Sequence, residues 1–220
     1  MAGKSSDSPH LFKVFPGKDP RSLIVRYPFQ DDSDVEYGFA EAAKRLAQSF
    51  SGEPIDDVIL MPFLFLWRHA IELSLKNQIR TAVTLRKLNG EDNPSLNKDE
   101  VAARLTKTHR IGQLAKELAG HFSHLDLPAM PEETRRTLEW LVAADPAGLA
   151  FRYSGALPDT QDFIDFPKLS GSLEETYKMV SAGKDVLWAY GEAQDEFLAI
   201  QREQQAEYEA EMRQYMDYDY

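Results

Sequence analysis

The chain has 220 residues, 43% of them hydrophobic and 28% charged, which is ordinary for a globular domain with its own core. It contains no cysteine, which excludes disulfides and thiolate metal sites and favours a cytoplasmic location. The formal net charge of −11 weakens a nucleic-acid-binding interpretation, because such proteins usually present a basic face. Cations in the middle of the chain still predict a local basic edge: Arg80, Arg86, Lys87, Lys98, Arg104, Lys107 and Arg110.

The ends of the chain differ from its middle. Residues 1–10 lack the apolar core of a signal peptide and are expected to form a disordered leader. Residues 11–200 are expected to form a single domain, and residues 201–220 an acidic helical extension or tail. The apolar run at 58–67 is shorter than the roughly 20 residues that span a bilayer, and Pro62 interrupts it. The sequence therefore predicts no membrane span.

The first predicted elements are two short strands, at 11–15 and 22–27, around a Pro-Gly turn. Ser33 and Glu36 have the spacing of a capping box and predict the start of a helix that ends near residue 51. A second helix is expected after Pro54, with Pro62 in its first turn or at a kink and a stop at the Asn-Gly pair of residues 89–90.

The second half of the chain predicts three more helices. A polar loop at 91–98 precedes a helix at about 107–122, and Pro131 starts another that Asp145-Pro146 stops. Segments 151–155 and 162–167 predict a small hairpin, and a capping box at Ser172 opens a long last helix. The apolar side of that helix is expected to carry Leu173, Tyr177, Val180, Leu187, Tyr190, Phe197 and Ile200. The expected fold class is mainly α, a bundle of four to five helices with small β-hairpin decorations.

Inside the second helix, charged side chains form a row on an otherwise apolar surface. Arg68, Glu72 and Lys76 lie at i, i+4 and i+8, with His69 about 100° round from Arg68. A solvated ladder of this kind would be worth about 0.3–0.5 kcal/mol per pair. Because apolar residues surround the row, we predict a buried or cleft-lining polar cluster with specific partners. The residues leave open whether that cluster is catalytic or structural.

Three segments carry a resemblance to a known family. They are the Arg-His-x-x-Glu-Leu-x-x-Lys pattern at 68–76, His109 followed by Ile111 and Leu114, and Phe-Arg-Tyr at 151–153 after Asp145. Over roughly residues 55–190 the chain resembles the prokaryotic HEPN-like proteins. The resemblance implies an all-α bundle, usually a homodimer, from a group rich in host-defence and toxin proteins, many of them metal-independent endoribonucleases without a cofactor.

The family's ribonucleases pair an arginine with a histidine five to seven positions later. In this chemistry the histidine acts on the 2′-hydroxyl or the leaving oxygen, and the arginine steadies the phosphate. Arg104 and His109 have the spacing, but Leu105 replaces the usual polar residue, and Arg68 has no histidine at that distance. His109 could instead meet Arg68 and Glu72 across the bundle in a composite site. The resemblance thus implies two sets of site residues. The catalytic set is Arg68, His69, Glu72 and His109, and the substrate-binding set is Lys76, Arg104, Arg152 and Tyr153.

Other constellations are weaker. His121 and His124 have the spacing of a metal pair, but no third ligand is near in the sequence, so no metal site is expected. Arg152 could pair with Glu72 or Asp145 and cap the cleft.

Two functions follow from these observations. The first is a HEPN-like bacterial defence or stress-response protein that cleaves or binds RNA. The second is a non-enzymatic interaction or regulatory module, in which the polar row is structural or binds a small ligand. In that module the acidic C-terminal helix contacts a protein partner.

Overall fold

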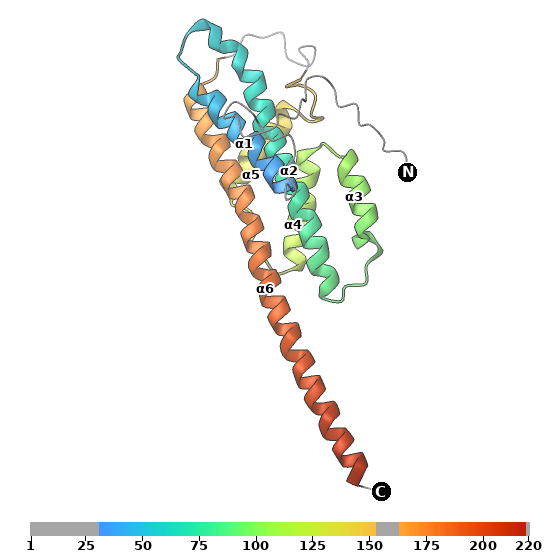
Figure 1. Cartoon of the computed structure of the whole chain (residues 1–220). Helices are drawn as coiled ribbons and strands as arrows, with labels where there is room; N and C mark the ends of the chain where they lie inside the picture. Colours follow the sequence, from blue (N-terminus) through green and yellow to red (C-terminus); the bar gives the residue numbers. More distant parts are fainter. Residues whose placement is uncertain (1–30, 153–162, 219–220) are drawn as a thin grey trace, which may run out of the picture.

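The computed structural model describes residues 31–152 and 163–218, with side chains described up to Arg213. Six α-helices and two short 3-10 helices follow one another in this part of the chain (Figure 1). They are α1 (Asp32–Gln48), η1 (Pro54–Ile59), α2 (Leu60–Leu88), η2 (Pro94–Leu96), α3 (Lys98–Lys107), α4 (Ile111–His124), α5 (Glu132–Ala144) and α6 (Phe166–Tyr218). The prediction of a mainly α fold is confirmed.

The predicted β decorations are not seen. The strands expected at 11–15 and 22–27 lie outside the described residues, as does most of the hairpin expected between 151 and 167. Its described part is not extended, because residues 151–152 form a turn and Phe166 begins α6. No strand occurs in the described ranges.

Helix α2 is the centre of the bundle and packs against α1, α3, α4 and α6 (Figure 1). Its near-continuous apolar surface explains this position, since such a helix gains most by burial on all sides. Pro62 lies in its first turn, where a missing N–H costs no intrahelical bond. Asn89 follows its last residue and Gly90 adopts a φ of +80°, as the predicted Asn-Gly stop requires.

Helix α2 and the 3-10 helix before it also have to be considered as a possible membrane span. Among the described residues, the stretch Pro54–Leu88 is long and apolar enough to cross a membrane by length and composition, with a mean hydropathy of 1.5 in its best window. The sequence-based estimate considered only the run at 58–67 and so understated this length. Half of that window is buried inside the bundle, as expected for the core helix of a folded domain.

Helix α1 starts differently from the prediction. The N-cap is Asp31, whose Oδ1 accepts hydrogen bonds from the backbone N–H of Ser33 (2.8 Å) and Asp34 (3.1 Å). Asp34 Oδ2 accepts from the N–H of Asp31 at 3.0 Å, so the capping box is Asp31–Asp34 rather than Ser33–Glu36. Glu36 is then free to turn its carboxylate into the bundle, where its exposed fraction is 0%.

The region between α2 and α4 was also predicted wrongly. The residues expected to be a polar loop contain η2, and α3 follows because Asn97 caps it through the backbone N–H groups of Asp99 and Glu100. Extended backbone at Thr108 and Arg110 then separates α3 from α4, so the predicted single helix from 107 begins only at Ile111. This break places His109 in a linker rather than in a helix.

Helix α6 begins earlier and packs over a shorter distance than predicted. It starts at Phe166, so Ser172 lies inside the helix and does not cap it. Leu173 and Leu187 are buried against the bundle. Phe197 and Ile200, predicted to belong to the buried side, are exposed, because the bundle ends before them and the last part of α6 projects alone (Figure 1).

Two glycines of α6 provide a matched test of its packing. A Cβ at Gly183 would overlap Gln78 Oε1, which belongs to a buried side chain held by Val180 O (2.8 Å). A Cβ at Gly171 would meet nothing within 4 Å. Gly183→Ala should therefore destabilise the protein by about 1–3 kcal/mol through overpacking, whereas Gly171→Ala should stabilise it by up to about 1 kcal/mol through helix propensity. Urea unfolding of both variants measures the contrast, and equal effects would contradict the close approach of α6 to α2.

Candidate functional site

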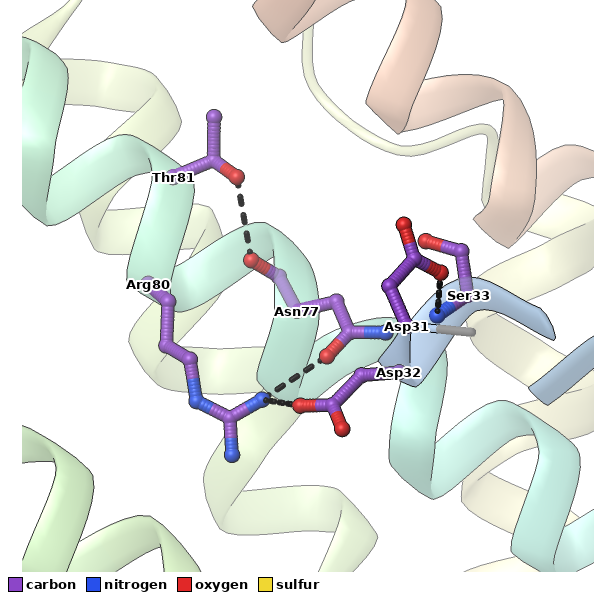
Figure 2. Close-up of a pocket in the computed structure, with 6 residues that line it drawn as sticks. All are labelled: Asp31, Asp32, Ser33, Asn77, Arg80 and Thr81. Atoms are coloured by element: carbon purple, nitrogen blue, oxygen red, sulfur yellow. Dashed lines mark hydrogen bonds and ion pairs between the residues drawn. The ribbon is translucent and has the colours of Figure 1, made fainter. Parts of the chain in front are cut away.

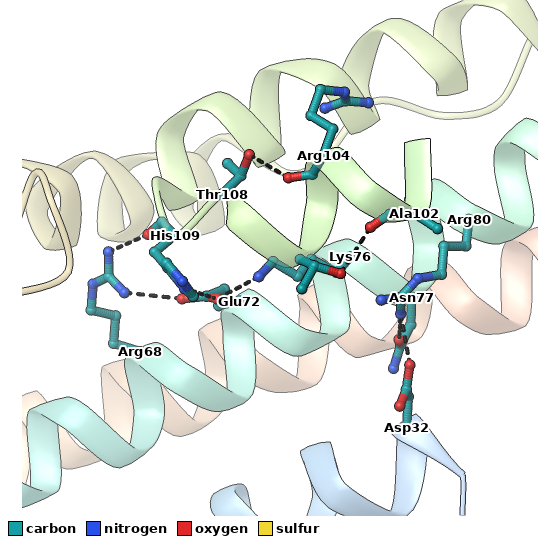
Figure 3. Close-up of polar contacts among 11 residues, drawn as sticks. Asp32, Arg68, Glu72, Lys76, Asn77, Arg80, Ala102, Arg104, Thr108 and His109 are labelled. Carbon is teal, nitrogen blue, oxygen red and sulfur yellow. Dashed lines mark hydrogen bonds and ion pairs between the residues drawn. The ribbon is translucent and has the colours of Figure 1, made fainter. Parts of the chain in front are cut away.

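Arg68 is the buried anchor of the polar row. Its side chain is 2% exposed, and all three guanidinium nitrogens face a partner. Nη1 donates to Glu72 Oε2 at 3.2 Å, and Nη2 donates to the backbone oxygen of His109 at 2.7 Å. Nε lies 3.0 Å from Asp145 Oδ2, in an ion pair that lacks hydrogen-bond geometry. Figure 3 shows two of these contacts. Arg68 thereby ties α2 to the linker before α4 and to the end of α5.

Glu72 is the second centre of this network and is 1% exposed. Its Oε1 accepts from Lys76 Nζ at 2.7 Å and from His109 Nδ1 at 2.9 Å (Figure 3). Burial by itself raises the pKa of Glu72, but the hydrogen bonds from Lys76 and His109 outweigh it and hold the pKa below its usual value. Glu72 is therefore an ionised carboxylate, and with Asp145 it balances the charges of Arg68 and Lys76.

His109 is the member of the network that reaches the surface, with its side chain 49% exposed. Glu72 accepts from Nδ1, so in the neutral ring Nε2 carries no proton and can accept one. A carboxylate that fixes the tautomer and orientation of a histidine is the arrangement used by acid–base histidines in enzymes. The structure thus brings His109 together with Arg68 and Glu72, although His109 meets Arg68 through its backbone.

His69 lies apart from the network. Its ring stacks near Phe65, with centroids 5.7 Å apart, and meets the ring of Phe39 edge-on at 4.3 Å. Burial lowers the pKa of His69, with the charge of Glu72 opposing the shift. Its buried Nδ1 has no hydrogen-bond partner among the described residues. His69 therefore packs between aromatic rings, and no contact places it in a catalytic group.

The remaining predicted site residues are dispersed. Arg104 forms two hydrogen bonds to Glu117, at 2.6 and 2.5 Å, and so joins α3 to α4. Figure 3 shows its side chain directed away from His109, so the linear Arg104–His109 spacing does not form a pair. Arg152 lies over the ring of Phe65, 4.9 Å from its centroid, and the described residues show no ion pair from it to Glu72 or Asp145. Tyr153 lies outside the described residues.

Glu117 gives a pH-dependent prediction. Burial raises its pKa, but the nearby His121 ring, 3.7 Å away, and the hydrogen bonds from Arg104 prevail and lower it to about 2. Because the folded pKa is depressed, the stabilisation is complete above the unfolded pKa near 4.5 and disappears as the pH falls toward 2. Glu117→Gln should cost on the order of 1–2 kcal/mol at pH 7, allowing for partial exposure, and little at pH 2. Urea midpoints across this range measure the change, and parallel pH profiles of the two proteins would refute it.

Sequence reasoning missed a second buried carboxylate, Glu36. It accepts from Tyr177 Oη at 3.1 Å and from Lys184 Nζ at 3.0 Å, and so links α1 to α6. Burial and the nearby Glu36 charge raise the pKa of Tyr177. Its burial could have been predicted from its place in the helix. Glu36 lies four residues before Ala40 and seven before Ala43, which form the buried side of α1.

Three of the seven side chains in the predicted basic edge form ion pairs, namely Arg80, Arg86 and Arg104. Arg80 pairs with Asp32 at 2.7 Å. Arg86 is buried between Glu91 and His121, whose Nδ1 lies 2.9 Å from Arg86 Nη1. These pairs neutralise part of the edge, whereas Lys87, Lys98, Lys107 and Arg110 have no ion pair among the described residues.

A shallow depression of about 420 Å³ lies between the start of α1 and the middle of α2, away from the network (Figure 2). Arg80 bonds Asp32 and Asn77 there, so its charge is already neutralised. The lining residues are Asp31, Asp32, Ser33, Asn77, Arg80 and Thr81. Within the described ranges, no group of three or more histidine and carboxylate side chains could hold a metal ion.

Comparison with known proteins gives no relative: no family model matches the chain, and neither a curated protein nor a solved structure matches it. The HEPN-like resemblance therefore stays a prediction that rests on short segments. Two of those segments, the α2 row and His109, meet in space. Function has to be argued from the contacts of these residues and from the surface of the bundle.

Proposed function

We propose that this protein is a non-enzymatic interaction module. In this proposal the buried network holds the bundle together, and the projecting part of α6 contacts a protein partner. One contrast carries the proposal: the charges of the polar row are paired within the chain, whereas α6 presents large apolar side chains to solvent.

Magnitudes favour a structural role for Arg68. To hold a substrate phosphate, Arg68 would have to give up its ion pairs with the buried carboxylates of Glu72 and Asp145. Removing one partner of a buried ion pair costs about 3–5 kcal/mol, whereas a hydrogen bond to a charged group returns about 1.5–3 kcal/mol. The exchange is unfavourable, and the 2% exposure of the Arg68 side chain leaves no path for the phosphate.

The end of α6 has the opposite character. Phe197 and Tyr208 are 58% and 63% exposed on a helix with no other described element beside it (Figure 1). Isolated apolar side chains are common on surfaces, but a set on one side of a projecting helix is typical of a binding surface. The bundle would then serve to hold this helix in place.

In-cell photo-cross-linking tests the proposal. A benzophenone side chain replaces Tyr208 in the full chain, and the matched control replaces Ala206, which lies on the opposite side of α6. We expect a discrete adduct of constant mass from position 208 and none from position 206. The absence of adducts from position 208, with normal protein levels, would refute the interaction function.

One observation favours a second candidate function, cleavage of RNA by a HEPN-like bacterial defence or stress-response protein. Glu72 orients the ring of the exposed His109, which can then exchange a proton with the 2′-hydroxyl or the leaving oxygen of RNA. Lys107 and Arg110 are exposed beside it and can attract phosphates. Arg68 would act as a positioning residue for His109 rather than as a catalytic one. A homodimer, as the resemblance implies, would present two such histidines.

Purified protein distinguishes the two candidates. If the second is correct, the wild type cleaves RNA in the presence of a chelator, and His109→Ala loses roughly 10²–10⁴-fold of the rate. Its melting temperature should change little, because the ring is half exposed and Glu72 keeps Arg68 and Lys76. His124→Ala is the matched control, since His124 is exposed and bonds only Gly120 O among the described residues. No cleavage by the wild type would remove this candidate.

A further inference from the structure

Four large apolar side chains of the projecting part of α6 lie on one side of the helix, with the polar side chains of Gln201 and Gln204 between them. At 100° per residue, Phe197, Ile200, Tyr208 and Met212 fall within a sector of about 120°. All four side chains are exposed. Trp188 is exposed as well but lies on the opposite side of the helix, so it does not belong to this surface. We call the four side chains the α6 stripe.

The α6 stripe continues the spacing by which α6 packs on the bundle. Val180, Leu187 and Gln194 recur every seven residues and are buried, and Gln194 Nε2 donates to Leu85 O of α2 at 3.1 Å. Two more steps of seven lead to Tyr208, which no described part of the bundle covers. A seven-residue apolar spacing is the pattern by which one helix packs along another.

A row of glutamates borders the α6 stripe. Glu203, Glu207 and Glu211 lie at i, i+4 and i+8, a spacing at which like charges repel along a helix. Residues 195–213 carry six acidic and two basic side chains. Among the described side chains of this segment, Arg213 forms an ion pair with Glu209. The three glutamates of the row form no ion pair with a described side chain. The surface therefore pairs apolar anchors with unneutralised negative charge.

A second copy of the chain would not place positive charge against the glutamate row. In an antiparallel pair of projecting helices the glutamate row would face the same row of the other copy. In a parallel pair it would face the flank that carries Gln201 and Gln205, which are neutral. The cations of the segment, Arg202 and Arg213, lie on the far side of the helix from the α6 stripe.

We infer that the projecting part of α6 binds a basic amphipathic helix of another protein. This inference rests on the proposed interaction function and names its partner class. The partner's apolar residues pack on Phe197 and Tyr208, about 16 Å apart along the helix axis. Its lysines or arginines lie against Glu207 and Glu211. An i, i+3, i+4, i+7 pattern of apolar anchors with a basic flank is the recognition element that this surface selects.

A designed peptide pair tests the partner class with the full-length protein. The probe is a fluorescent 21-residue helical peptide with leucine at the a and d positions and lysine on its flanks, and its counterpart carries glutamate in place of lysine. Fluorescence anisotropy at physiological salt should show saturable binding of the basic peptide only. The double variant Phe197→Ser/Tyr208→Ser should weaken binding by about tenfold or more, whereas Trp188→Ser should leave it unchanged.

Charge-matched variants separate this site from general attraction to an acidic protein. Glu207→Lys/Glu211→Lys should weaken binding of the basic peptide about tenfold or more, while Glu192→Lys/Asp195→Lys, with the same charge change on the opposite side of α6, should have little effect. Equal losses in both double variants would overturn the inference. A dimer in sedimentation that Tyr208→Lys dissociates would overturn it too, by assigning the surface to a second copy.

The cross-linking experiment keeps the two proposals distinguishable. Adducts from position 208 without binding of the basic peptide would overturn the partner class and leave the interaction function in place. No adducts and no peptide binding would overturn both.

Discussion

Arg68→Met is expected to destabilise the protein by about 3–5 kcal/mol, the largest loss that any single substitution in the polar row should cause. Methionine keeps much of the volume but removes the charge, so Glu72 and Asp145 would be left buried with one fewer cation between them. The backbone oxygen of His109 would also lose its donor. A domain of this size is stable by about 5–15 kcal/mol, so the loss consumes a large part of its stability.

Urea unfolding of the purified variants measures this effect. The matched control is Arg135→Met on α5, where Arg135 pairs with Glu132 and Glu139 on the surface. Exposed pairs contribute about 0–1 kcal/mol, so the control should stay near the wild type. If Arg68→Met fails to fold, Arg68→Lys keeps the charge with fewer donors and should give a smaller, measurable loss. A loss below 1 kcal/mol in Arg68→Met would contradict a structural network.

The central helix could be predicted from sequence because its signals are local and agree with one another. An apolar surface over several turns, Pro62 near its start and the Asn-Gly pair after its end all act within α2 itself. Helix α3 could not be predicted in this way. It has 10 residues, of which only Val101 and Leu105 are buried, so its periodicity is weak and its start depends on the Asn97 cap.

The burial of the polar row could be predicted from its apolar surroundings, but its partners could not. Asp145 and His109 reach Arg68 from other elements, and such contacts are set by how the helices pack rather than by spacing along the chain. The Arg104–His109 spacing shows that residues close in sequence do not always meet in the fold. These residues are close in sequence, yet the break after α3 separates them and Glu117 takes the guanidinium.

Phe197 and Ile200 show a third limit. Their periodicity correctly places them on one side of α6, but a periodic stripe does not state what covers it. Whether the side is core or surface depends on where the other helices end, and α2 ends at Leu88. The same pattern that predicted burial therefore becomes an exposed surface, which in our proposal a partner helix covers.

Gly148→Ala is expected to destabilise the protein by about 2–4 kcal/mol, because it combines backbone strain with displacement of Arg68. Gly148 has a φ of +81°, and a Cβ there would lie 3.0 Å from Arg68 Nη2 and 3.1 Å from Nη1. The guanidinium cannot retreat without lengthening its contacts to Glu72 and Asp145. The turn after α5 thus needs glycine for two reasons, its conformation and the close approach of Arg68.

Gly90→Ala separates these two terms. Gly90 has a nearly identical φ of +80°, but a Cβ there would meet nothing within 4 Å, so its cost should be the strain alone, about 1–2 kcal/mol. The excess at Gly148 should shrink in an Arg68→Lys background, since the shorter head group leaves room for the methyl, while the cost of Gly90→Ala should not change. Urea unfolding of the three single variants (Gly148→Ala, Gly90→Ala and Arg68→Lys) and the two double variants, beside the wild type, measures this coupling. Equal costs at the two glycines in both backgrounds would mean that Arg68 is not held against the turn, and the structural role of the network would lose its main support.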